Sequence, residues 1–124
     1  MTVNNVDSLD IKIKHSKKAV DHFLNGLVNL DINPSDILLA IDGDRHAIYA
    51  NMPIQTENYV NTMNAYIAQK SESMGIHLLD LHPIFENDYK ENEKSFSFKT
   101  DYHWNSYGHR LVANSILNSN FLTP

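Results

Sequence analysis

The stretch "GIHLLDL", Gly75 to Leu81, carries the clearest sign of the fold. Ile76 to Leu81 is an apolar run of the length of one β-strand, and glycine often ends a helix in the left-handed conformation. An apolar run without alternation is typical of a strand with both faces buried, as in a parallel sheet covered by helices. The stretch therefore predicts a helix that stops at about Met74 and a buried strand directly after it.

A second run of this kind is "ILLAI", Ile37 to Ile41, which follows the turn-forming residues Asn33-Pro34-Ser35-Asp36. A helix predicted from Gln55 to about Met74 links the two runs. Strands that are joined by a helix usually lie in one sheet and run parallel. We therefore expect Ile37 to Ile41 and Ile76 to Leu81 to be adjacent parallel strands, each apolar on both faces.

Two further helices are predicted on either side of these strands. The first begins at Ser16 as N-cap and runs to Leu30, and the last runs from about Ser106 to Ser119. The first has its apolar stripe at Ala19, Val20, Phe23, Leu24, Leu27 and Val28. The last turns Leu111, Val112, Ser115 and Ile116 inward. Two stretches stay open: "LDIKI", Leu9 to Ile13, alternates like a strand, and "SFSF", Ser95 to Phe98, is either a short extended segment or a loop.

Helices and strands in alternation predict an α/β fold, with a parallel sheet between two layers of helices. At 124 residues the chain is expected to form a single domain, residues 1–124. Ligands of such sheets bind beyond the carboxyl ends of the strands. "DGDRH", Asp42 to His46, follows the first strand and the loop from His82 follows the second, so both are predicted to lie on the functional edge.

Composition excludes several classes of function. A formal net charge of −5 argues against a general nucleic-acid binder, which needs a basic surface. The chain has no cysteine, so it has neither disulfides nor thiol chemistry. No apolar run approaches the roughly 20 residues of a membrane span, and "MTVNNVDSLD" lacks the basic start and apolar middle of a signal peptide. The compartment stays open.

The chemistry is concentrated in "FKTDYHWNSYGHRLVANSI", Phe98 to Ile116, which contains more reactive and aromatic residues than a helix entrance needs for capping. A tight turn can fold the Asp101 carboxylate back onto one ring nitrogen of His103. The other ring nitrogen is then free to act as a base, and the carboxylate stabilises the cation that forms. Such a pair usually activates a hydroxyl nucleophile.

These residues resemble a known family. "TDYHWNSYGHRLVANSI" is similar to the C-terminal signature of the SGNH hydrolases, the GDSL-type esterases and acetylesterases, in which Asp, any residue, His, Trp, Asn, two residues, Gly and His follow one another. "GIHLLDLHPIF", Gly75 to Phe85, resembles the strand and loop before that block. The resemblance implies the flavodoxin-like SGNH fold, with Asp101 and His103 as acid and base of a Ser-His-Asp triad. It implies scaffold roles for Trp104, Asn105, Gly108 and His109.

The chain also departs from the family pattern. The family's Gly-Asp-Ser block, with its nucleophile, is not found, and neither are the glycine and the Gly-x-Asn-Asp segment of the oxyanion hole. The nearest string is "VDSL", which makes Ser8 a weak candidate nucleophile, and "DGDR" has Arg45 where a serine would be needed. The chain therefore resembles the C-terminal portion of the family fold, an incomplete domain without the nucleophile-bearing segment.

Several alternatives stay open for the individual residues. Asp101 can be a capping carboxylate and His103 a partly buried histidine. His109 lies six residues after His103, which is not the spacing of zinc ligands on one helix face, so packing or capping is expected. His82 can face the site, although a solvated loop histidine is the simpler interpretation. Turn chemistry explains Asp42, Asp44 and His46, which otherwise suggest a metal loop.

Three functional hypotheses follow. The first is an SGNH-type ester hydrolase or O-acyl or acetyl transferase that acts on a small-molecule ester or an acylated carbohydrate without a cofactor. The second is a non-catalytic SGNH-like remnant that serves as a binding or interaction module. The third is a metal site made by Asp101, His103 and His109. An incomplete sheet also predicts a homodimer formed through an exposed strand edge.

Overall fold

The computed structural model describes the backbone of residues 2–123 and the side chains of residues 8–123. The chain divides into two compact units. Unit 1 contains the residues up to Leu38 together with Gln55–Leu78, and unit 2 contains Leu39–Ile54 together with the residues from Leu79 onward. Each strand of the sheet begins in unit 1 and ends in unit 2.

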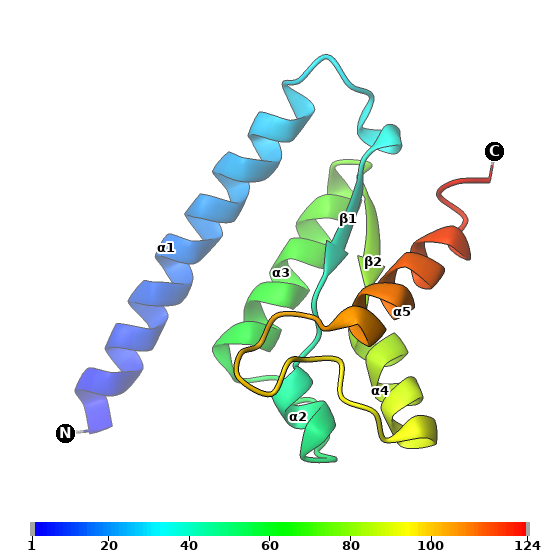
Figure 1. Ribbon diagram of the computed structural model, residues 1–124. Helices are drawn as coiled ribbons and strands as arrows, with labels where there is room; N and C mark the ends of the chain where they lie inside the picture. The colour runs from blue at the N-terminus through cyan, green and yellow to red at the C-terminus, as the bar shows by residue number, and fades with distance from the viewer. Residues whose placement is uncertain (1, 124) are drawn as a thin grey trace. The chain divides into compact units, whose positions relative to one another are not determined.

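The sheet consists of two strands, β1 (Leu38–Ile41) and β2 (His77–Asp80) (Figure 1). The His77 N–H donates to the Ile37 carbonyl at 3.1 Å, and the Leu81 N–H donates to the Ile41 carbonyl at 3.1 Å. Both partners advance by four residues in the same direction, which is the pattern of a parallel pair. The prediction of adjacent parallel strands joined by a helix is confirmed, and with it the α/β fold class.

The strands are less buried than predicted. In β1 only Ile41 is buried, whereas Ala40 is exposed, and in β2 both His77 and Asp80 are exposed. The expectation that both faces are apolar and covered is therefore wrong for the described chain. A sheet of two strands is smaller than the usual four to six, which is consistent with a portion of a larger α/β domain.

In unit 1, helix α1 (Thr2–Val28) begins far earlier than predicted. The candidate strand Leu9 to Ile13 lies inside this helix, and so does Ser16, which is not an N-cap. No glycine or proline interrupts the helix before Gly26, so nothing in this stretch stops a helix from extending through it. Alternation over five residues is too short to outweigh that continuity.

Helix α1 packs against α3 (Tyr59–Ser73), and the contacts include polar and aromatic groups. The Ser16 and Tyr59 hydroxyls are 2.6 Å apart, and the Tyr66 hydroxyl donates to the Asp21 carboxylate at 2.5 Å. Of the predicted stripe, Leu24 is buried and Val20, Leu27 and Val28 are half-buried, whereas Ala19 and Phe23 are exposed.

Helix α3 begins at Tyr59 and not at Gln55, because the Asn58 side chain caps it by accepting from the Asn61 N–H at 2.8 Å. Its end is as predicted. Gly75 has φ +75°, the left-handed conformation in which glycine ends a helix without strain. Before β1, the short 3-10 helix η1 (Pro34–Asp36) occupies the predicted turn, with Asn33 as its cap.

Unit 2 contains three helices, α2 (Arg45–Tyr49), α4 (His82–Asn92) and α5 (Ser106–Leu117). Of these helices only α5 is predicted from the sequence. Val112 is buried as expected, and the helix ends at Leu117, two residues before the predicted end at Ser119. The segment from His82 is a helix and not a loop. Its signal is the proline at the first turn, a position that proline favours because the missing N–H is not needed there.

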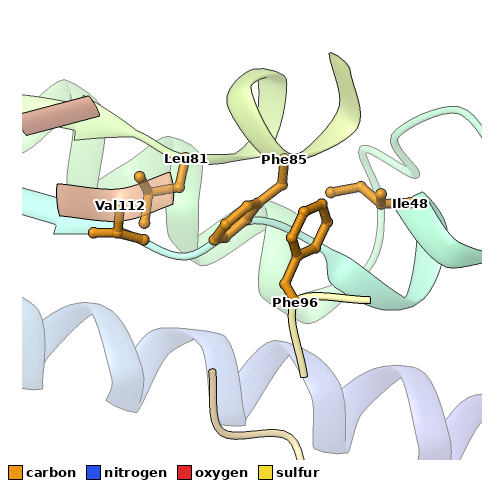
Figure 2. Close-up of a cluster of buried hydrophobic side chains, with 5 residues drawn as sticks. All are labelled: Ile48, Leu81, Phe85, Phe96 and Val112. Carbon is orange, nitrogen blue, oxygen red and sulfur yellow. The ribbon is translucent and has the colours of Figure 1, made fainter. Parts of the chain in front are cut away.

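The core of unit 2 is a cluster of five buried side chains from four different segments (Figure 2). Its members are Ile48, Leu81, Phe85, Phe96 and Val112. The Phe85 and Phe96 rings stack with centroids 4.5 Å apart. This core joins the end of β2 and helix α4 to the segment just before the Asp-x-His-Trp block, and it therefore gives that block a rigid base.

Candidate acid–base site

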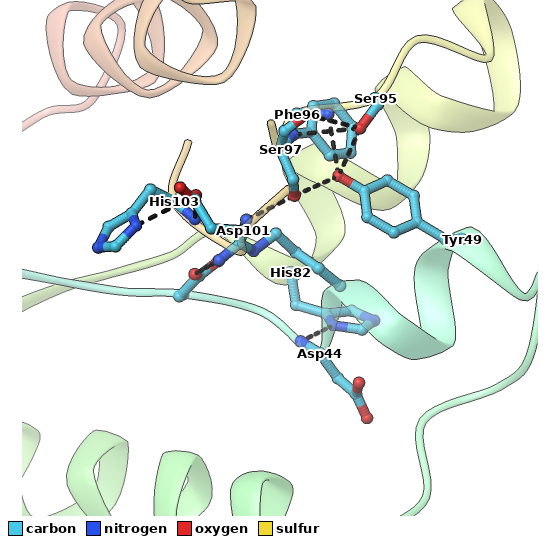
Figure 3. Close-up of polar contacts among 10 residues, drawn as sticks. Asp44, Tyr49, His82, Ser95, Phe96, Ser97, Asp101 and His103 are labelled. Atoms are coloured by element: carbon cyan, nitrogen blue, oxygen red, sulfur yellow. Dashed lines mark hydrogen bonds and ion pairs between the residues drawn. The ribbon is translucent and has the colours of Figure 1, made fainter. Parts of the chain in front are cut away.

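Asp101 and His103 lie together on the loop before α5, in contact with each other (Figure 3). The Asp101 Oδ1 atom accepts from the His103 backbone N–H at 2.8 Å and lies 3.1 Å from Nδ1 of the ring. Because a carboxylate only accepts, this contact places a hydrogen on Nδ1 and leaves the lone pair on Nε2. The side chains are 50% and 88% exposed, respectively, so Nε2 is accessible.

The loop that carries the pair is closed at its base by a β-bridge between Ser97 and Trp104. The Phe98 N–H donates to the His103 carbonyl at 3.2 Å, and the Asn105 N–H donates to the Phe96 carbonyl at 2.7 Å. The "SFSF" segment is thus extended at Ser97. The bridge makes residues 98–103 a short closed loop, in which His103 lies at the base and Asp101 is two residues further into the loop.

Asn105 connects this loop to α5. Its side-chain oxygen accepts from the Gly108 N–H at 2.9 Å and caps the helix. Its side-chain NH2 donates to the carbonyls of Ser95 at 2.9 Å and Ser97 at 3.1 Å. The Asn105 side chain therefore binds both the first turn of α5 and the extended segment that precedes the loop.

The other members of the block pack closely around the bridge. A Cβ at Gly108 would lie 2.6 Å from the Phe96 carbonyl oxygen and 3.1 Å from the Trp104 Cβ. The Trp104 ring packs edge to face against the rings of Phe85 and His109, with centroid distances of 6.2 Å and 5.5 Å, respectively. These contacts support the scaffold roles that the resemblance implies for Trp104, Asn105, Gly108 and His109.

Asp42 and Arg45, which follow β1, lie against the same loop. The Arg45 Nη2 atom is 3.0 Å from the Asp42 Oδ2 atom, and Nη1 donates to the Ser97 hydroxyl at 2.7 Å. Burial raises the pKa of Asp42 above its usual 3.8, while the Arg45 charge and a hydrogen bond from Trp104 oppose that rise. Asp42 is therefore a partly buried carboxyl group paired with a cation.

The metal-loop alternative does not match this geometry. Asp42 pairs with Arg45, Asp44 caps α2 by accepting from the Ala47 N–H at 3.1 Å, and His46 is exposed. Within the part of the chain that the structure describes, no three His, Asp or Glu side chains are placed to share a metal ion. This finding also contradicts the hypothesis of a metal trio formed by Asp101, His103 and His109.

His82 is buried, with 7% of its side chain exposed, and is not a solvated loop residue. Its Nδ1 atom accepts from the Asp44 N–H at 3.0 Å, and Nε2 lies 3.4 Å from the Glu86 carboxylate. Since Nδ1 accepts, the hydrogen of the neutral ring is on Nε2 and faces Glu86. A Cβ at Gly43 would lie 2.6 Å from the His82 Cα, so glycine is required for this close approach.

A cavity of about 220 Å³ brings the two parts of the site together. Its lining residues are Asp42, Arg45, Tyr102, His103, Trp104 and His109. The Arg45 guanidinium also lies 5.9 Å from the centre of the Tyr102 ring. His103 therefore borders a hollow that contains aromatic surface, a carboxyl group and a cation, and the predicted edge beyond the strand ends does gather these residues.

Sequence reasoning missed the hydrogen-bond network beneath the loop. The Tyr49 hydroxyl lies 2.8 Å from the Ser97 hydroxyl and accepts from the Phe96 N–H at 2.9 Å. Tyr49 and Arg45 belong to α2, a helix that no local sequence pattern predicts. Both contact Ser97 because the fold brings these distant segments together. Ser8, the weak candidate nucleophile, is an exposed residue of helix α1 and not the end of a strand.

An α/β chain whose Asp-x-His pair stands at a helix entrance beyond the strand ends has the features of an SGNH hydrolase-like domain. Residues 14–119 match the family model described as "SGNH hydrolase-like domain, acetyltransferase AlgX", and the chain belongs to this family. The match extends through both units. No curated protein and no solved structure matches the chain. Among the described residues, no helix is long and apolar enough to cross a membrane.

Proposed function

We propose that this chain supplies the acid–base half of an acyl-transfer site, with Asp101 and His103 in the roles of triad acid and base. The contact that supports this proposal is the 3.1 Å approach of the Asp101 carboxylate to Nδ1 of His103. It orients the ring and leaves Nε2 accessible, which is what a general base for a hydroxyl nucleophile requires.

The proposed site needs a serine nucleophile, and none of the residues that line the cavity beside His103 is a serine. Ser-His-Asp triads occur in different chain orders, so the serine-bearing segment can come before or after these residues, or from a separate polypeptide. His103 takes the serine proton while the serine oxygen attacks the ester carbonyl, and it returns that proton to the leaving alcohol. The acyl group then passes to an acceptor hydroxyl or to water. The proposed substrate is a small ester or an acylated carbohydrate.

The first experiment measures the chain by itself on p-nitrophenyl acetate. Without a nucleophile and an oxyanion hole, we expect no more than the background rate of histidine side chains. His103→Ala should change that rate by less than about tenfold, which corresponds to about 1.4 kcal/mol of barrier. Enzymatic turnover that is lost in both Ser8→Ala and His103→Ala would contradict the proposal.

The second experiment adds a polypeptide that carries the family's Gly-Asp-Ser segment. We expect acyl transfer to appear only in the mixture and to be lost in His103→Ala and in the serine variant of the added segment. Asp101→Asn should lower the rate by about 10⁴-fold, the effect of removing the triad acid in an intact site. Equal rates for the wild type and His103→Ala in an active mixture would show that the pair has no catalytic role.

A non-catalytic binding role has one observation in its favour. The Asp101–His103 contact is open to solvent, where an ion pair contributes only about 0–1 kcal/mol, whereas triad carboxylates are usually buried. If the chain is a binding module, an acetylated oligosaccharide should bind to it alone, and His103→Ala should weaken binding without any turnover. Binding that requires the serine-bearing polypeptide would favour the catalytic interpretation.

A further inference from the structure

His82 connects the first turn of α4 to the segment between β1 and α2 (Figure 3). Its ring Nδ1 atom accepts a hydrogen bond from the Asp44 backbone N–H at 3.0 Å, and its own backbone N–H donates to the Asp80 carboxylate at 3.0 Å. The side chain is buried, and a Cβ at Gly43 would lie 3.0 Å from Nδ1. The imidazole therefore packs directly against the turn that leads into α2, and all of these residues belong to unit 2.

The hydrogen bond to Nδ1 lies at the start of the helix that supports the loop of the candidate site. Asp44 is the N-cap of α2. The same helix carries Arg45, whose Nη1 atom donates to the Ser97 hydroxyl at 2.7 Å, and Tyr49, whose hydroxyl lies 2.8 Å from that of Ser97. Ser97 is one of the two residues of the bridge that closes loop 98–103. The position of α2 therefore affects the base of this loop.

We propose that His82 is a positioning residue: by accepting the Asp44 N–H it fixes the start of α2, and α2 in turn fixes the base of loop 98–103. A helix of five residues is too short to be stable by itself, so its position depends on contacts such as this one. The inference rests on the proposed function of Asp101 and His103, which this loop carries. His82 takes no part in acyl transfer in this proposal.

Only the neutral form of His82 can make this contact. The neutral ring has its hydrogen on Nε2, 3.4 Å from the Glu86 carboxylate, and its lone pair on Nδ1. Protonation adds a hydrogen to Nδ1, which then faces the Asp44 N–H donor and breaks the hydrogen bond. The other titratable groups on the residues that contact the ring or its backbone are the carboxyls of Asp44, Asp80 and Glu86, the last of which pairs with Lys90. Carboxyl groups usually titrate at lower pH than imidazoles, so the two kinds of titration can be distinguished.

The test compares His82→Leu with His82→Asn in the full chain. The two new side chains have the same branching and both lose the contact to Glu86, but only asparagine keeps an acceptor at the δ1 position. In the leucine variant we expect the hydrogen-exchange protection to fall by about tenfold, the effect of one lost hydrogen bond, at two amides. One is the Asp44 amide, and the other is the Phe98 amide, which closes the loop by donating to the His103 carbonyl. Asparagine should restore the protection of both amides.

The wild type gives a second measurement, which needs no folded leucine variant. At neutral pH the ¹⁵N shifts of the His82 ring should show a hydrogen on Nε2 only, and comparison with His82→Asn assigns this ring among the seven histidines. As the pH is lowered, the protection factors of the Asp44 and Phe98 amides should fall with the same midpoint as the ring titration. His82→Asn should keep both amides protected through this range, because an amide side chain does not titrate. A histidine that only fills space would produce no such pH dependence.

The matched control is His46→Leu. His46 is an exposed residue of α2, so this variant makes the same chemical change on the same helix without altering the contact to Nδ1. The Asp44 and Phe98 amides should remain as protected as in the wild type. Exchange of the Val112 amide, in the core of unit 2, shows whether each variant is folded.

The inference is overturned by equal protection of the Asp44 amide in the leucine and asparagine variants, or by a loss at Asp44 that leaves Phe98 protected. If the leucine variant is unfolded, the wild type decides: a hydrogen on Nδ1 of His82 at neutral pH, or amide protection that does not follow the ring titration, overturns it. Failure of the proposed function looks different. In that case Phe98 responds to His82→Leu, but the wild-type His103 ring shows no preferred tautomer and does not change in Asp101→Asn.

Discussion

At Gly108 the helix that follows the site has no room for a side chain. The Phe96 carbonyl oxygen lies 2.6 Å from where a Cβ would be, and backbone atoms cannot turn aside as the end of a flexible side chain can. The glycine of the block is therefore required by packing. Its absent side chain allows α5 to approach the segment that precedes the loop.

This contact predicts that Gly108→Ala destabilises the protein even though alanine is the better helix former. We expect a loss of about 1–3 kcal/mol from the forced displacement, measured by urea unfolding. Gly26→Ala in α1 is the matched control, since a Cβ there meets nothing within 4 Å. It should stabilise by about 0.5–1 kcal/mol. Equal effects of the two substitutions would contradict the packing argument.

Asp42 predicts a pH dependence of stability. Burial raises its pKa above 3.8 in the folded protein, so the folded state binds this proton more tightly than the unfolded state. As the pH rises from 3.8 through the raised folded value, the unfolded state ionises first and this carboxyl lowers the free energy of unfolding. Below that window both states keep the proton and the contribution vanishes.

Asp42→Asn removes this titration. The difference in free energy of unfolding, variant minus wild type, should therefore increase between about pH 3.5 and neutral pH. Urea unfolding across this range measures it, with the exposed Asp36→Asn as control. A difference that is constant or decreases with pH would mean that Arg45 and Trp104 outweigh burial.

At the scale of an element, helix α5 depends on Asn105 for more than its cap. Its side-chain oxygen accepts a hydrogen bond from the first turn of the helix, and its NH2 group donates to two carbonyls of the preceding segment. Only asparagine or glutamine combines an acceptor oxygen with two N–H donors on one side-chain group, and the shorter asparagine is the better cap. The helix start and the loop base are therefore positioned together.

Asn105→Asp tests these two roles separately, because aspartate caps as well as asparagine does but donates nothing. We expect a loss of about 1–3 kcal/mol, since the carbonyls of Ser95 and Ser97 lose their donor and meet a negative charge. The corresponding Asn33→Asp at the cap of η1 should be nearly neutral, because the capping group there is the side-chain oxygen, which accepts from the Ser35 N–H. Thermal unfolding of both variants gives the comparison, and a neutral Asn105→Asp would show that capping is the only role.

At the scale of the whole molecule, β1 and β2 pair only with each other in the described chain, residues 2–123. The outer edge of each strand therefore offers unpaired backbone groups. We expect the isolated chain to self-associate through such an edge, as a homodimer or as aggregates. Light scattering at increasing concentration measures this, and a monomer at high concentration would contradict it.

The elements that could be predicted are those with a complete local signal. The two apolar runs, the left-handed Gly75 and the stripe of α5 each lie within a few residues, and each is confirmed. Helices α2 and α4 were missed because α2 is only five residues long and α4 begins with a histidine and a proline after a strand. The start of α1 at Thr2 could not be predicted, because the alternation at Leu9 to Ile13 also fits a strand.

For the candidate site, the sequence by itself indicated the Asp101–His103 contact, because two residues separated by one position can meet in a tight turn. It also determined the family, because that block is contiguous. Only the tertiary structure decided that Arg45 reaches Ser97, 52 residues away in sequence, and that Asp42 lines the same cavity as Trp104. Hydrogen bonds between such distant segments depend on how the strand ends and helices pack, and no local pattern carries that information.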